Sequence, residues 1–204
     1  RRQRNDTAAP CRHRRSVASH TVCGRFVSTT SPDELASYFQ VDVNGIDSSN
    51  AERSNDRTPH HGTTTGRYNV APTAEVFVVY EDGDLRRLDG FHWGLVPGWA
   101  QDLKVGNRMI NARAETVAQK PAFRRAFAKR RCIVPADGFY EWTKESDPNN
   151  PKKPRKQPHY ISRPDGEPYA FAGLWERWRG DLNGDGTETE VRSTTIITTA
   201  ANEP

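Results

Sequence analysis

The residue that could carry the most distinctive chemistry is Cys23, in the string Val22-Cys23-Gly24-Arg25-Phe26. An N-terminal cysteine carries an α-amine of pKa about 7.7 to 8.0 and a thiol of pKa about 8.5, so both groups are partly deprotonated near neutral pH. Such an amine can condense with an aldehyde to an imine, and the thiol can then close a five-membered thiazolidine at high effective molarity. Inside a chain the same nitrogen is an amide, so this chemistry requires Cys23 to be the first residue of the working protein.

The segment before Cys23 differs in charge from the rest of the chain. Residues 1–21 contain six arginines and one aspartate, a charge of +5, whereas the remaining 24 basic and 25 acidic residues give −1. We interpret residues 1–22 as a leader that is either non-native, translated from a misplaced start, or a disordered basic tail that contacts nucleic acid. We favour the first interpretation because a GUG start codon would be read as Val22, directly before Cys23.

Composition and cysteine usage restrict the class of protein. The 204 residues are 34% hydrophobic and 9% aromatic, which suits one compact domain with polar loops. No apolar run approaches the roughly 18 residues of a membrane span, and none resembles a signal-peptide core. Cys11, Cys23 and Cys132 show no metal-ligand or disulfide pattern, so we expect no metal, no cofactor and a reducing, cytoplasmic location, nucleoid-associated in a prokaryote. Cys132, in an apolar run, is predicted to be buried.

The sequence predicts one early helix and one late helical segment. The string Ser-Pro-Asp-Glu at residues 31–34 has the capping-box pattern with proline at the first helical position, which predicts a helix to about Gln40. Residues 114–130 are predicted to be helical in two pieces, broken at Pro121. Residues 42–67 are rich in Asn, Asp, Ser, Thr and Gly and are predicted to form a long loop.

Short strands make up most of the other predicted elements. Asp82-Gly83 predicts a hairpin turn, and the Pro- and Lys-rich residues 143–158 predict a solvated extension of a hairpin. Many short strands with two or three helices predict a single α+β domain in which the strands are largely antiparallel. Apolar and alternating runs place the strands at residues 76–80, 85–88, 91–96, 132–135, 139–142, 159–162, 169–175 and 191–199.

Five short sequence motifs occur along the chain in an order that is typical of one family. They are CGRF at residues 23–26, RYNVAP at 67–72, WGLVPGW at 93–99, NARAET at 111–116 and GFYEW at 138–142. Together they resemble the SRAP family, the SOS-response-associated peptidase proteins. The resemblance implies a barrel-like core with flanking helices over residues 23–204. It also implies an incomplete C-terminus, because the chain stops before the family's His-Asp-Arg segment.

The resemblance implies that the protein captures a DNA lesion covalently. The same resemblance implies a protein that recognises abasic sites in single-stranded DNA, or at junctions of single- and double-stranded DNA, and crosslinks to them through its N-terminal cysteine. The product is a thiazolidine that shields the lesion. Residue by residue, the match gives the nucleophile as Cys23, the active-site amide and carboxyl as Asn111 and Glu141, and a DNA-contacting guanidinium as Arg113. The partner is then single-stranded DNA with abasic sites, and we expect a monomer without membrane contact.

The residue types suit these roles. A ring-opened deoxyribose offers an aldehyde, hydroxyls and flanking phosphates, which an amide, a guanidinium and a proton-shuttling carboxyl can bind. On a strand, Glu141 would share a face with Phe139, and a carboxyl beside a phenyl ring has a raised pKa, which suits a general acid. Arg25, beside the nucleophile, is predicted to contact a DNA phosphate.

Two further DNA contacts are predicted, each with a structural alternative. Asn69 is either a DNA contact or a turn residue that organises its loop. Trp93 is either a stacking platform for an unpaired base or, like Trp99, a packing residue of the core or its rim.

Two other functions use the same residues. One is a thiol peptidase or autopeptidase in which Cys23 attacks a peptide bond and Glu141 assists. The other is a non-catalytic module that binds single-stranded DNA. The first predicts release of the leader without DNA, and the second predicts salt-dependent affinity with no covalent product.

Overall fold

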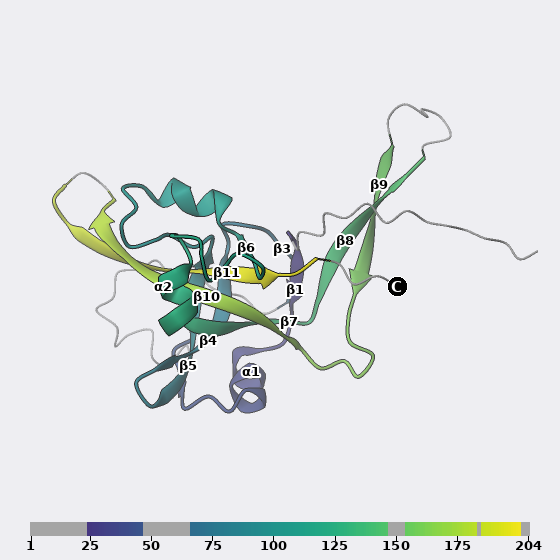
Figure 1. Cartoon of the computed structure of the whole chain (residues 1–204). Helices are drawn as coiled ribbons and strands as arrows, with labels where there is room; N and C mark the ends of the chain where they lie inside the picture. Colours follow the sequence, from purple (N-terminus) through teal and green to yellow (C-terminus); the bar gives the residue numbers. More distant parts are fainter. Residues whose placement is uncertain (1–23, 47–65, 147–153, 183–184, 201–204) are drawn as a thin grey trace, which may run out of the picture.

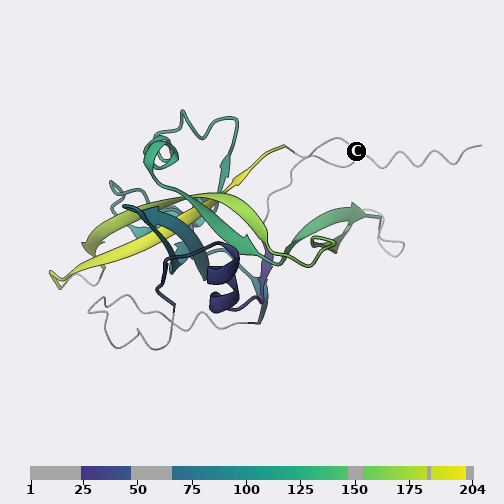
Figure 2. The same ribbon diagram turned by 90° about the horizontal axis from the view of Figure 1, so that it is seen from below.

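The chain folds around a small barrel, with one hairpin projecting at each end (Figures 1 and 2). The computed structural model describes residues 24–46, 66–146, 154–182 and 185–200. The elements described there are β1 (Phe26–Ser28), α1 (Pro32–Tyr38), β2 (Val43–Asn44), β3 (Arg67–Val70), β4 (Glu75–Asp82), β5 (Leu85–Trp93), the 3-10 helix η1 (Leu103–Arg108), β6 (Asn111–Arg113), α2 (Arg124–Lys129), β7 (Arg131–Ala136), β8 (Gly138–Glu145), β9 (Arg155–Ile161), β10 (Tyr169–Asp181) and β11 (Glu188–Thr198).

Five strands close the barrel. The larger sheet has the order β2-β5-β4-β7-β10-β11-β6, and an additional pairing of β5 with β11 joins its inner strands into a ring. The pairings of β4, β7 and β10 are antiparallel, whereas β11 pairs in parallel with β5 and β6. The predicted α+β class, with a largely antiparallel barrel-like core and few helices, is therefore confirmed.

Alternating side chains of the barrel strands fill its interior. Phe91, Tyr80 and Trp175 pack with ring centroids 5.1 to 5.7 Å apart, and Phe26 enters from β1. Cys132 lies in the same cluster, where burial raises the pKa of its thiol to about 12 against the opposing effect of a hydrogen bond with Thr194. The prediction that Cys132 is a buried apolar residue is confirmed.

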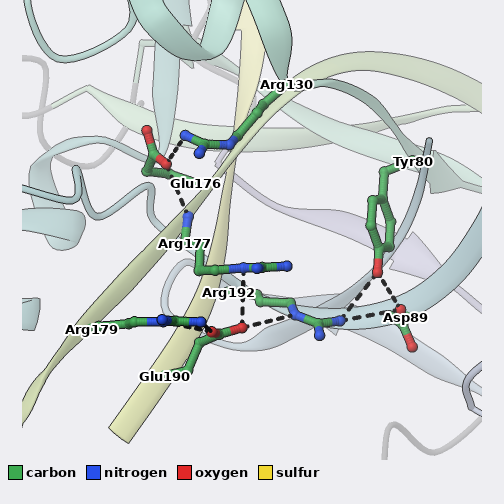
Figure 3. Close-up of polar contacts among 8 residues, drawn as sticks. All are labelled: Tyr80, Asp89, Arg130, Glu176, Arg177, Arg179, Glu190 and Arg192. Atoms are coloured by element: carbon green, nitrogen blue, oxygen red, sulfur yellow. Dashed lines mark hydrogen bonds and ion pairs between the residues drawn. The ribbon is translucent and has the colours of Figure 1, made fainter. Parts of the chain in front are cut away.

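A network of ion pairs and hydrogen bonds runs along β10 and β11 and reaches Tyr80 and Asp89 on β4 and β5 (Figure 3). Glu190 accepts from Arg177 and Arg179 at 3.1 and 2.8 Å. The Tyr80 hydroxyl donates to Asp89 at 2.6 Å. Burial is the main cause, and this hydrogen bond the second cause, of a rise in the pKa of Tyr80 to about 12. The remaining members of the network are Arg130, Glu176 and Arg192. Each carboxylate thus has at least one arginine partner at the barrel rim.

A second, four-stranded antiparallel sheet lies beside the barrel. Its strand order is β3-β1-β8-β9, and its long β8–β9 hairpin extends away from the body at the end opposite to the β10–β11 hairpin (Figures 1 and 2). Only Asp137 separates β7 of the barrel from β8 of this sheet. The hairpin extension expected over residues 143–158 includes strand at 143–145 and 155–158; residues 147–153 lie outside the described residues.

The local predictions differ in outcome. In α1 the capping box of Ser31 and Glu34 is present, and the predicted β4–β5 hairpin turns at Gly83, whose φ of +65° suits glycine. Only Arg124–Lys129 of the predicted helical segment is α-helix, because residues 114–123 form turns. The helical prediction for this first piece is wrong: Pro121 lacks an N–H donor and disfavours helical backbone in the residue before it.

Asp137 joins the second sheet to the end of β1. Its carboxylate accepts hydrogen bonds from the backbone N–H groups of Thr29 and Thr30 and from the Thr30 hydroxyl. Its own N–H donates to the Val27 carbonyl at 2.9 Å. Burial alone would raise the pKa of Asp137, but these hydrogen bonds outweigh it and lower the pKa.

We predict that Asp137→Asn destabilises the protein in a pH-dependent way. Because the folded-state pKa lies below the unfolded value of about 3.9, this carboxylate stabilises the fold fully above that pH and less as the pH falls through the folded-state pKa. We expect a loss of about 1–3 kcal/mol in the free energy of unfolding at pH 7 and a smaller loss at pH 3, measured by urea unfolding. The exposed Asp84→Asn is the control, and an equal loss at both pH values would contradict the assignment.

Candidate functional site

Four strands, with the segment just before β1, carry the residues that the sequence singles out, and Trp93 lies on β5. Arg25 precedes β1, Asn69 lies on β3, Glu141 on β8, and Asn111 and Arg113 on β6. Cys23 lies outside the described residues, which begin at Gly24. The site is therefore described from Gly24 onward.

The register of β1 against β8 brings the start of the described chain to Glu141. Phe26 lies opposite Phe139, and the Tyr140 N–H donates to the Arg25 carbonyl at 2.9 Å. Extending this antiparallel register two residues beyond the Phe26–Phe139 pair sets Gly24 opposite Glu141. The residue that follows Cys23 in the chain thus lies across from the predicted catalytic carboxyl.

Glu141 has the electrostatic character expected of a general acid. The side chain is half-buried, and its Oε1 is buried without a hydrogen-bond partner among the described residues. Burial raises the pKa of Glu141, and a hydrogen bond from the Trp142 backbone opposes the rise. The expected direction of the shift is confirmed. A carboxyl with a raised pKa keeps a larger protonated fraction near neutral pH and can donate that proton.

Arg25 and Asn69 are brought together across the β1–β3 pair. The Arg25 Nη1 donates to the Asn69 Oδ1 at 3.0 Å, and the Asn69 side chain is exposed. This hydrogen bond holds the guanidinium in one orientation and leaves its other N–H groups available. Asn69 therefore lies where it can orient Arg25, in addition to any contact of its own.

Asn111 and Arg113 project from the same face of β6. This strand pairs in parallel with β11, where Ile196 lies opposite Asn111 and Thr198 opposite Arg113. Ala112, between them, is buried in the cluster that includes α2. Because side chains alternate along a strand, Asn111 and Arg113 point away from that cluster, and both are half-buried.

The Trp93 side chain is 0% exposed, so its ring offers no surface on which a base could stack. Its ring packs 5.1 Å from that of Phe26, and its Nε1–H donates to the Ile110 carbonyl at 2.9 Å. The predicted DNA contact at Trp93 is incompatible with this burial. The structure agrees with the alternative, in which Trp93 packs in the core. Trp99, from the same string, is instead 64% exposed.

Trp93 connects the part of the site near Arg25, just before β1, with the part that begins at Asn111 on β6. The sequence alone did not predict this role. Phe26 follows Arg25, and Ile110 precedes Asn111. One buried indole therefore sets the position of β1 relative to β6. The signal in the sequence was the alternation of Phe91 and Trp93 on a strand, which indicates that both face the same interior.

Within the described part of the chain, no group of three or more His, Cys, Asp or Glu side chains is arranged to hold a metal ion. The same residues include no helix that is long and apolar enough to cross a membrane.

Comparison with known proteins identifies the family. The family model of the SOS response associated peptidase (SRAP) matches residues 22–204, and the chain belongs to this family. It is 38% identical over 182 residues to the abasic site processing protein YoqW of Bacillus subtilis, covering 89% of this chain and 70% of that protein. It is 32% identical over 184 residues to the abasic site processing protein YedK of Escherichia coli, covering 89% and 69%.

A solved structure supports the fold. A crystal structure of a protein from Bacteroides thetaiotaomicron matches with a TM-score of 0.66 and 25% identity, covering 87% of this chain and 68% of that one.

We predict that the Trp93 indole is a major stabilising group. Trp93→Phe keeps an aromatic ring beside Phe26 and removes one of the two donors to the Ile110 carbonyl, which still accepts from the Ile196 N–H, so we expect a loss of about 0.5–1.5 kcal/mol in the free energy of unfolding. Trp93→Ala also leaves a cavity and should cost about 3–5 kcal/mol. Chemical denaturation measures both. Trp99→Phe is the control and should change stability by about 0.5 kcal/mol or less; an equal effect at both positions would contradict the assignment.

Proposed function

We propose that this chain processes abasic sites in DNA by covalent capture through Cys23. The observation that carries the proposal is its membership of a family whose relatives are named abasic site processing proteins. The register that sets Gly24 opposite Glu141 supports it, because the half-buried carboxyl then lies across from the residue next to the nucleophile.

The proposed reaction has two bond-forming steps. The α-amine of an N-terminal Cys23 attacks the aldehyde carbon of the ring-opened deoxyribose, and the loss of one water gives an imine. The Cys23 thiol then adds to the imine carbon, its proton passes to the nitrogen, and a thiazolidine closes. Protonated Glu141 supplies the proton that lets the hydroxyl leave as water, which its raised pKa favours.

The other residues bind the substrate in this proposal. Asn111 bonds the sugar oxygens, while Arg113 and Arg25 each contact a phosphate. Asn69 orients Arg25 through the hydrogen bond at 3.0 Å. Single-stranded DNA is the proposed substrate, because an unpaired lesion exposes its aldehyde. The monomeric state and the cytoplasmic location stay predictions.

The test of capture is an oligonucleotide with one abasic site, incubated with the chain starting at Cys23. We expect a heat-stable adduct whose mass is that of protein plus DNA minus one water. Cys23→Ala should give none. Cys23→Ser keeps the amine but lacks the thiol, so it should be trapped only when borohydride reduces the imine. An undiminished stable adduct from Cys23→Ala would overturn the proposal.

The 204-residue form, in which the Cys23 nitrogen is an amide, is the matched control. We expect it to form no adduct. If it instead releases residues 1–22 without DNA, and Cys23→Ala abolishes the release, the peptidase alternative is supported. If it binds DNA in a salt-dependent way but the form beginning at Cys23 gives no covalent product, the chain is a binding module.

We further predict that Asn69 acts on DNA through Arg25. Arg25→Ala should weaken binding to undamaged single-stranded DNA and reduce the slope of log affinity against log salt by about 0.7, the value for one phosphate. Asn69→Ala should weaken binding by about 2- to 12-fold without changing the slope, because the charge remains. In the Arg25→Ala background it should have no further effect. Additive losses in the double variant would show that Asn69 contacts DNA independently.

A further inference from the structure

The outer face of the β8–β9 hairpin carries rings and cations that the proposed reaction does not use. Side chains alternate along β8, so Tyr140, Trp142 and Lys144 lie on the face opposite to that of Glu141. Their cross-strand partners on β9 are Tyr160, Pro158 and Lys156, respectively. We define Tyr140, Trp142, Lys144, Lys156 and Tyr160 as the hairpin face.

The rings of the hairpin face are held in place and still open to solvent. The Tyr140 centroid lies 5.4 Å from that of Tyr160 and 6.4 Å from that of Trp142. The Tyr140 hydroxyl donates to the Tyr68 carbonyl at 3.2 Å. Even so, Trp142 is 42% exposed and Tyr160 is 50% exposed. Such a row of fixed, exposed rings offers flat surfaces with little ordering entropy to lose on binding.

Gly138 is part of this arrangement. A Cβ at this position would come within 2.4 Å of the Tyr160 ring, so that ring lies directly over the glycine backbone. The Tyr160 hydroxyl donates to the Asp137 carbonyl at 3.3 Å at the same point. The absence of a side chain at Gly138 therefore lets Tyr160 lie against the strand.

The charges of the hairpin face indicate an anionic partner. Lys144 lies directly opposite Lys156, and like charges at directly opposed positions of a sheet repel. Among the described residues neither lysine forms an ion pair, whereas four arginines toward the other end of the molecule each have a carboxylate partner: Arg130, Arg177, Arg179 and Arg192. An anion bound between Lys144 and Lys156 would offset the repulsion.

The hairpin face is continuous with Arg25, whereas Glu141 lies on the opposite face of β8. Arg25 lies opposite Tyr140 in the ladder, and opposed residues share a face. From Tyr140 to Lys144 the strand advances about 14 Å. A linear polyanion held at Arg25 could therefore continue along the rings to the two lysines.

We propose that the hairpin face binds the single-stranded DNA that flanks the lesion. Bases stack on Trp142 and Tyr160, and phosphates lie near Lys144 and Lys156. The combination of π-faces with unpaired cations at strand spacing fits an unpaired nucleic acid strand, in which every base has a face to stack and every step has a charge. The proposal rests on the proposed function, because it extends the DNA path from Arg25.

The test measures binding of the 204-residue chain to undamaged single-stranded DNA, which needs no free amine at Cys23. Lys144→Glu with Lys156→Glu should reduce the slope of log affinity against log salt by at least about 1.4, the value for two phosphates. Trp142→Ala should weaken binding by about 5- to 140-fold. The paired reversal Lys120→Glu with Lys129→Glu, on exposed residues outside the hairpin, makes the same change in net charge.

The outcomes separate this proposal from the reaction. Equal losses in the two charge reversals, or unchanged DNA binding in the hairpin variants, would overturn it; in the latter case the face serves another partner. If Trp142→Ala fails to fold, the salt dependence of DNA binding by the variant with Lys144→Glu and Lys156→Glu still tests the proposal. In the form beginning at Cys23, a short abasic oligonucleotide with one flanking nucleotide on each side should crosslink equally well to the parent and the lysine variant. Failure of the parent to crosslink, with a clear loss of affinity in the lysine variant, would reject the capture reaction alone.

Discussion

The arrangement of the site depends on the hydrogen bond from the fully buried Trp93 indole to the Ile110 carbonyl. A buried donor without a partner is costly, so this bond, together with the one from the Ile196 N–H to the same carbonyl, holds the backbone just before Asn111. The same indole packs on Phe26, which ties the carbonyl to β1 and, through the ladder, to Glu141 on β8. Residues from two sheets are thereby held in one arrangement by a side chain that touches no solvent.

The passage from the barrel into the second sheet gives Glu141 its character. β7 is a barrel strand, and after Asp137 the chain continues as β8, which pairs with β1 and β9. Glu141 thus lies where burial favours its neutral form, whereas Asp137, four residues earlier, is kept charged by three hydrogen bonds. The two carboxyls have opposite pKa shifts because burial outweighs the single backbone hydrogen bond to Glu141, whereas the several hydrogen bonds to Asp137 outweigh its burial.

The two ends of the molecule use charge differently. On β10 and β11, arginines and carboxylates pair with one another (Figure 3). At the β8–β9 end, Lys144 and Lys156 oppose each other beside exposed rings. Ion pairs that are already formed offer little to a ligand, whereas unpaired cations retain their full field. An anionic partner would therefore be attracted to the end that also carries Arg25 and Glu141.

The sequence by itself determined what depends on near neighbours and on motif order. The capping box at Ser31, the turn at Gly83, the burial of Cys132 and the family all follow from short strings. Only the tertiary structure decided that Trp93 is buried while Trp99 is exposed, that Asn69 meets Arg25, and that the Arg25 carbonyl accepts from the Tyr140 N–H beside Glu141. The physical reason is that burial and strand register arise from partners far away in the chain, which local spacing does not encode.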